Sequence, residues 1–147
     1  MDLSGSENGR DRRESGGSVE RKAFCASEPN DVYRAVSTSL GRERFWATSA
    51  PESGGVISFV LADGRTGECR IEKAVQDVLY RLQYFGRTLT FALAASETGG
   101  TELTLTSSDP ADCAEVISLL LRLKASVDFG VDLRNHDETR TTSYADC

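Results

Sequence analysis

Two tyrosines are the residues of this sequence best suited to chemistry in an apolar interior. Tyr80 and Tyr84 alternate with Arg81 and Gln83, so a β-strand would carry both hydroxyls on one face. Such a pair could orient a polar group of a ligand or donate a hydrogen bond to an enolate oxygen. The simpler interpretation is that both rings belong to the core and that their hydroxyls reach its rim.

A lysine in the last third of the chain is the second candidate. Lys124 lies within the apolar arc of a predicted helix, close to Ile117 and Leu120. An ammonium facing a cavity would bind an anionic ligand or act as an electrophile. Alternatively the side chain snorkels toward solvent and pairs with Asp128, four residues further on.

Other chemistries find little support. The single histidine, His136, lies between Asp132 and Asp137; it could serve as a base or as one metal ligand, and we expect a polar extension. The four cysteines lie far apart with no CxxC pair, at Cys25, Cys69, Cys113 and Cys147. We therefore expect reduced thiols and no metal site. No GxSxG, Walker A or GxGxxG motif occurs, so we expect no nucleotide and no other cofactor.

Composition excludes further classes. The chain has 147 residues, enough for one domain, and a formal net charge of −6, which argues against binding a nucleic-acid backbone. Only three residues are lysine, and no basic patch for anionic membranes is present. No apolar run approaches the length of a membrane span, so we expect a cytoplasmic protein.

The elements that must position these residues begin after a polar tail. Residues 1–18 contain almost no large apolar side chains, which predicts a disordered tail. Residues 19–25 alternate as in a strand, and Pro29 suits the first position of a helix. That helix is expected to end at Gly41, with one further turn before Trp46.

Short alternating segments then follow one another closely. Strands are expected at 56–61, 66–74 and 78–85, and again around Phe91 and Leu103. Asp63-Gly64 and Gly99-Gly100 are strong turn signals between them. Strands joined in this way predict an antiparallel meander rather than βαβ units.

A long helix closes the domain. Asp109 and Pro110 mark its start, and it is expected to run from about residue 111 to about residue 130. Its apolar stripe consists of Val116, Leu120, Leu123 and Val127, whereas Glu115, Ser118, Arg122 and Ser126 fall on the opposite side. Residues 131–147 would form a C-terminal extension.

This order of elements resembles the START/Bet v 1-like (SRPBCC) superfamily, and within it the polyketide-cyclase and Hsp90-ATPase-activator-like group. The resemblance covers roughly residues 19–129. It is carried by residues 27–33, Phe45-Trp46, Asp63-Gly64, residues 100–106 and Leu123-Lys124. It implies an α+β helix-grip fold, a curved antiparallel sheet wrapped around a long C-terminal helix. In many relatives a Trp opens that helix, whereas this chain has Ala114-Glu115-Val116.

Such a fold offers a cavity between the sheet and the helix. We therefore expect a small soluble protein that binds an apolar or amphipathic molecule there. The candidate ligand-binding residues are Trp46, Phe59, Tyr80, Leu82, Tyr84, Phe91, Leu103, Leu120 and Lys124. Two alternatives remain. One is a cyclase or dehydratase, for which Glu72 and Arg81 add to the ionisable candidates. The other is a protein-interaction module like the Hsp90 activators, which needs an exposed apolar patch.

Overall fold

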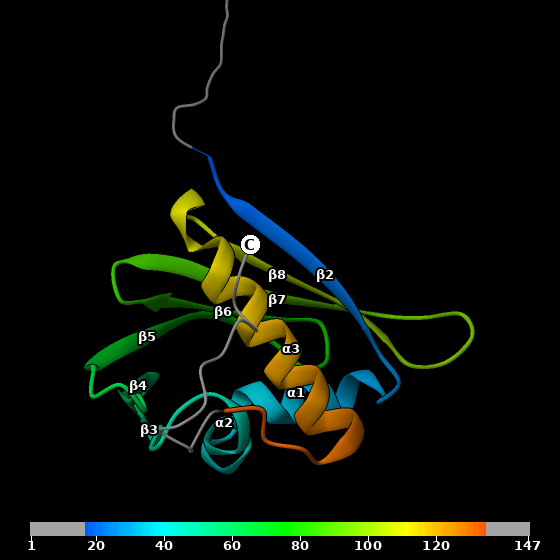
Figure 1. Ribbon diagram of the computed structural model, residues 1–147, viewed down its shortest axis with the longest axis horizontal. Helices are drawn as coiled ribbons and strands as arrows, with labels where there is room; N and C mark the ends of the chain where they lie inside the picture. The colour runs from blue at the N-terminus through cyan, green and yellow to red at the C-terminus, as the bar shows by residue number, and fades with distance from the viewer. Residues whose placement is uncertain (1–16, 135–147) are drawn as a thin grey trace, which may run out of the picture.

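A single curved sheet forms the framework of the computed structural model, which describes residues 17–134 (Figure 1). All strand pairs are antiparallel, in the order β2-β8-β7-β6-β5-β4-β3. The strands are β2 (Val19–Cys25), β3 (Glu52–Ser53), β4 (Val56–Val60), β5 (Thr66–Val75), β6 (Leu79–Tyr84), β7 (Arg87–Ala95) and β8 (Thr101–Ser107). The first and the last strands of the chain are thus neighbours, because β2 pairs with β8.

One face of this sheet is apolar, as the alternation predicts. Tyr80 lies opposite Phe91, which in turn lies opposite Leu105. All three side chains are buried. In β4 the buried side chains are those of Ile57 and Phe59, so the candidate Phe59 lies on the apolar face.

The helices cover this apolar face. They are α1 (Pro29–Ser37), α2 (Ser39–Phe45), a 3₁₀ turn η1 (Pro110–Asp112) and α3 (Cys113–Phe129). Helix α3 runs diagonally across the concave side of the sheet (Figure 1), packing against β2, β8, α1 and α2. Its C-terminus is capped by Gly130 in the left-handed conformation. The predicted helix-grip architecture is confirmed.

The corner between α1 and α2 differs from the expected boundary. The first helix ends before Thr38 rather than at Gly41, because the Thr38 hydroxyl accepts a hydrogen bond from the Gly41 amide and begins a new helix. Gly41 lies inside α2, where a Cβ atom would meet the carbonyl oxygens of Arg34 and Ala35 at 2.6 Å. The glycine permits a close helix approach and does not end a helix.

The region around β4 contains one predicted turn and one additional short strand. The predicted hairpin turn at Asp63-Gly64 is present, and Gly64 has a positive φ of 94°. The short strand β3 precedes β4 and pairs with it, with Glu52 opposite Ile57.

Some expectations lie outside the described residues. These are the tail over residues 1–16, His136 and Cys147. Cys25 and Cys69 are buried free thiols, as expected for these two cysteines. No helix within residues 17–134 is long and apolar enough to cross a membrane.

Candidate ligand-binding site

The residues predicted to line a cavity meet in an aromatic cluster between sheet and helices. The Trp46 ring lies 4.8 Å from the Phe59 ring and 5.4 Å from the rings of both Tyr84 and Phe91, measured between centroids. We call these four residues the aromatic interior. Trp46 comes from the end of α2 and the others from β4, β6 and β7, so this interior joins the helical layer to the middle of the sheet.

The other apolar candidates extend the same wall. Seven of the predicted site residues besides Tyr80 are between 0 and 3% exposed: Trp46, Phe59, Leu82, Tyr84, Phe91, Leu103 and Leu120. They belong to one contiguous cluster of buried side chains. The predicted apolar residues therefore lie together in the core, and their role toward a ligand stays a prediction.

Tyr80 is engaged by a buried arginine that the sequence pattern did not single out. Arg42 is 0% exposed and donates to the Ala50 carbonyl at 2.7 and 3.1 Å and to the Val36 carbonyl at 3.0 Å. Its guanidinium lies 3.5 Å from the Tyr80 hydroxyl. Burial raises the pKa of Tyr80 to about 12 despite this cation, so the phenol stays protonated at neutral pH. Arg42 ties α2 to the loop before β3.

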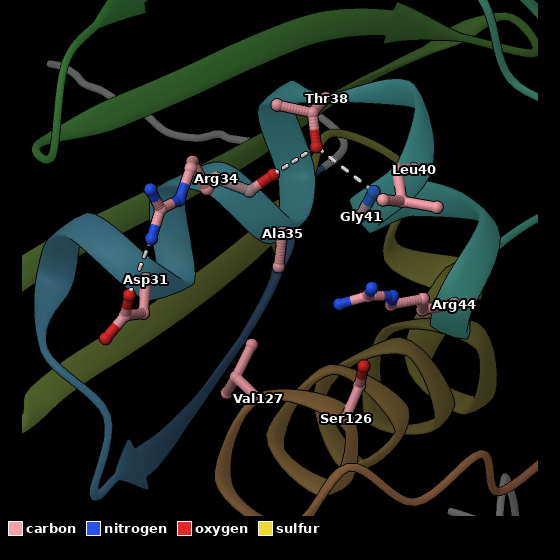
Figure 2. A pocket seen from close by; sticks show the side chains of 9 residues that line it. All are labelled: Asp31, Arg34, Ala35, Thr38, Leu40, Gly41, Arg44, Ser126 and Val127. Carbon is pink, nitrogen blue, oxygen red and sulfur yellow. Dashed lines mark hydrogen bonds and ion pairs between the residues drawn. The ribbon is translucent and has the colours of Figure 1, made fainter.

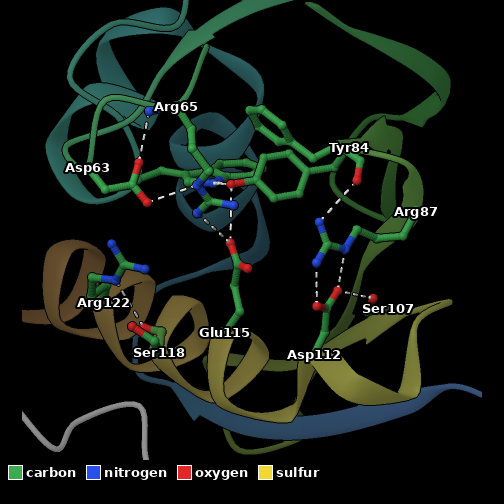
Figure 3. Close-up of polar contacts among 11 residues, drawn as sticks. Asp63, Arg65, Tyr84, Arg87, Ser107, Asp112, Glu115, Ser118 and Arg122 are labelled. Atoms are coloured by element: carbon green, nitrogen blue, oxygen red, sulfur yellow. Dashed lines mark hydrogen bonds and ion pairs between the residues drawn. The ribbon is translucent and has the colours of Figure 1, made fainter. Parts of the chain in front are cut away.

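Tyr84 lies at the point where the aromatic interior becomes polar. Its hydroxyl accepts a hydrogen bond from the Trp46 indole N–H at 3.2 Å and donates to the Glu115 carboxylate at 3.3 Å. Arg65 approaches the same carboxylate at 3.8 Å, as Figure 3 shows. Burial, and then the Glu115 charge, raise the pKa of Tyr84 well above its ordinary value. Tyr84 is thus a hydrogen-bond donor at neutral pH and a poor source of a transferable proton.

Arg65 is held over this region from three sides. Asp63 pairs with it at 2.8 Å, Glu115 faces it, and its guanidinium lies 5.4 Å from the centre of the Phe85 ring. Phe85 has φ 48°, an uncommon conformation for an aromatic residue, and its ring covers Gly67, where a Cβ atom would come within 2.8 Å. Gly67, in β5, therefore leaves the room that the Phe85 ring needs to lie beneath Arg65.

The polar side of α3 faces the sheet region around β4–β6, which the helical pattern did not predict. Glu115, Ser118 and Arg122, which we call the polar strip, were expected to point away from the core. In the structure α3 packs closely on β2 and β8, so one flank of the helix looks toward the Asp63-to-Arg65 hairpin (Figure 3). The helical period correctly grouped the strip, but it carries no information on which neighbour each side of a helix meets.

Lys124 lies apart from the aromatic interior. Its ammonium pairs with Asp128 at 3.2 Å, donates to the Phe24 carbonyl and lies 5.9 Å from the centre of the Phe24 ring. Phe24 is 48% exposed. The predicted pair with Asp128 is present, and the lysine serves the contact between α3 and β2.

The further acid–base candidates point away from the interior. Glu72 is exposed and accepts from Gln83, and Arg81 donates to Thr90. Arg81 and Gln83 alternate with the buried residues of β6, so they occupy the other face of the sheet. The ionisable groups that the structure brings to the aromatic interior are instead Glu115 and Arg65.

Two neighbouring pockets lie outside this interior, among the helices. One of about 330 Å³ lies between α1, α2 and the end of α3, lined by Arg34, Thr38, Leu40, Arg44 and Ser126 among others (Figure 2). A second, of about 340 Å³, shares Arg44 and Ser126 with it and continues to Val131 and Arg134. We call these two pockets together the helical groove.

Comparison with known proteins adds the fold class. No family model matches the chain, and no curated protein matches it. Among solved structures, the protein SSP2350 from Staphylococcus saprophyticus aligns with a TM-score of 0.68 at 21% identity, over 80% of this chain and 96% of that one. The Aha1 dimer from Colwellia psychrerythraea aligns with a TM-score of 0.67 at 20% identity, over 77% and 97%.

A third similar structure comes from a biosynthetic locus. DynU16, from the dynemicin biosynthetic locus, aligns with a TM-score of 0.65 at 15% identity over 82% of this chain, and this chain spans 50% of its length. Likenesses at these identities define the fold. The protein is therefore a helix-grip protein with the same fold as these solved structures.

Proposed function

We propose that this protein binds an apolar or amphipathic small molecule between the sheet and α3, against the aromatic interior. The observation that carries the proposal is the contact between Trp46, Tyr84 and Glu115, where an aromatic wall meets a polar helix flank. Here the sheet and the helix are bridged by the tips of long side chains, including the 3.8 Å approach of Arg65 to Glu115. Long side chains can move aside at lower cost than packed backbone. A ligand would place its apolar body on the rings and its polar group among Tyr84, Glu115 and Arg65.

The single tryptophan provides the measurement. Trp46 is the only tryptophan of the chain and is 2% exposed within the aromatic interior. We expect that long-chain alcohols, fatty acids or polycyclic phenols change its fluorescence saturably and raise the melting temperature in parallel. A panel of these compounds that leaves both signals unchanged would contradict the proposal.

A matched pair of variants locates the site. Ser118→Phe adds a ring on the polar strip, where the ligand's polar group is proposed to bind, whereas Ala114→Phe adds the same ring at an exposed position of α3. We expect binding to be lost in the first variant and kept in the second. Equal binding by both would place the ligand elsewhere on the protein.

A protein-interaction role is the second candidate, and the helical groove favours it. Leu40, at the edge of the groove (Figure 2), is 63% exposed. Val131, at its far end, is 46% exposed. Exposed apolar side chains beside a groove are typical of partner-binding surfaces. Purified Hsp90 should then bind the wild-type protein and bind Leu40→Ser more weakly. If the wild-type protein does not bind Hsp90, an interaction with Hsp90 is contradicted.

A further inference from the structure

Arg122 is a half-buried cation with few partners. Among the described residues the only hydrogen bond of its side chain runs from Nε to the Ser118 carbonyl, at 3.3 Å, and the guanidinium forms no ion pair. A guanidinium has five N–H donors, so most of them are left to solvent or to a ligand. Desolvation lowers the pKa of Arg122 below its ordinary value, which indicates that the charge is held at a cost in free energy.

The nearby acids are occupied by other cations. Glu115 accepts from Tyr84 and faces Arg65, and Asp132 pairs with Arg134 at 2.9 Å. Both carboxylates act on Arg122 only from a distance. The Arg134 cation lowers the pKa of Arg122 further.

The position of Arg122 suits a ligand's head group. It lies on the polar strip about one turn after Ser118 and two turns after Glu115, on the flank of α3 that faces the Arg65 hairpin (Figure 3). Tyr84 connects this flank to the aromatic interior. An apolar chain lying on the rings would therefore end near an unpaired guanidinium, whose planar fork binds carboxylates in two parallel hydrogen bonds.

We propose that the ligand is an amphipathic carboxylic acid whose carboxylate binds Arg122. This inference rests on the proposed function and adds the chemical class of the ligand. Partial burial strengthens the pair, because an exposed ion pair contributes little, whereas a charge-assisted hydrogen bond away from water contributes more. Binding supplies the counter-charge that the described residues lack at this position.

Decanoate and decanol test the inference, because they share an apolar chain and differ in charge. At pH 8 the wild type should bind decanoate about tenfold more tightly than decanol, the difference expected for one charge-assisted interaction. Arg122→Gln should remove this preference and leave decanol binding unchanged. Arg44→Gln is the matched control; Arg44 lines the helical groove, forms no hydrogen bond or ion pair among the described residues, and should leave the preference intact.

The outcomes separate the two proposals. If decanol and decanoate bind the wild type equally, or if Arg122→Gln keeps the preference, the inference is wrong and the binding function stands. If neither compound binds, both proposals fail. Arg122→Glu provides an independent test. This variant should bind the cationic decylamine more tightly than decanoate. Trp46 emission and circular dichroism establish that each variant is folded.

Discussion

At the scale of the residue, Asp128 shows how one carboxylate joins distant parts of the chain. It accepts hydrogen bonds from the Ala26 amide at 2.8 Å, the Ser27 amide at 2.9 Å and the Ser27 hydroxyl at 2.7 Å, and it pairs with Lys124. Its side chain is 1% exposed. The connection between β2 and α1 is thereby fixed to the last turn of α3.

Asp128→Ala should destabilise the protein by about 2–4 kcal/mol, because four donors, including the Lys124 ammonium, lose a buried charged acceptor. Burial alone would raise the pKa of Asp128, but the hydrogen bonds from Ala26, Ser27 and Lys124 lower it below 3.8. A carboxylate with a lowered pKa stabilises the folded state above its unfolded-state pKa, and this contribution is lost as the pH falls through the folded-state pKa.

The difference between wild type and Asp128→Ala, measured by urea unfolding, should therefore be full at neutral pH and shrink below about pH 4. Ser126 is a half-buried neighbour on the same helix, and its side chain forms no hydrogen bond among the described residues; Ser126→Ala should therefore cost less than about 0.5 kcal/mol. A difference that is independent of pH would show that the loss is one of packing alone.

The residues of the candidate site were predictable only in part. Alternation in the strands correctly placed Tyr80 and Tyr84 in the interior, because side chains on one face of a strand share one environment. Glu115 and Arg122 could not be found in this way, since their positions depend on where α3 crosses the sheet. Arg42 was hidden because a buried arginine bonded to backbone carbonyls leaves no periodic signal.

At the scale of the element, the corner between α1 and α2 depends on the absence of one side chain. Gly41 faces the backbone of Arg34 and Ala35 at distances that no Cβ atom tolerates. The sequence marked Gly41 as a helix end because glycine commonly has that role. Only the tertiary approach of the two helices shows that its small size is what matters.

Gly41→Ala should lower the free energy of unfolding by about 1–3 kcal/mol, because the corner must open to admit a methyl group. The adjacent Leu40→Ala removes an exposed side chain and should change it by less than about 0.5 kcal/mol. Urea unfolding monitored by Trp46 emission measures both. If Gly41→Ala were neutral, the helix corner would be more adaptable than its geometry implies.

At the scale of the whole molecule, the fold was predictable because several independent signals agreed. Alternating segments, Gly-containing turns and the Asp109-Pro110 helix start each pointed to an antiparallel sheet with a final helix. The site was not predictable to the same degree, because a fold of this kind serves many functions.

Ligand binding should be visible as a gain in global stability. A ligand present at 100 times its dissociation constant stabilises the folded state by about 2.7 kcal/mol, which should raise the melting temperature by several degrees for a domain of this size. Differential scanning calorimetry with and without decanoate measures the shift, and Ser118→Phe should abolish it. A shift that survives in Ser118→Phe would arise from binding outside the aromatic interior.

The pairing of β2 with β8 has a consequence for synthesis on the ribosome. Val19 lies opposite Ser107, and Cys25 lies opposite Thr101. The first strand therefore cannot pair until the last strand of the sheet has been translated. Contacts this distant in sequence slow folding, and until then the nascent chain carries an unpaired strand that can associate with other chains. Co-translational folding of this protein must therefore finish late, after β8 has left the exit tunnel and α3 can follow it to secure the first strand.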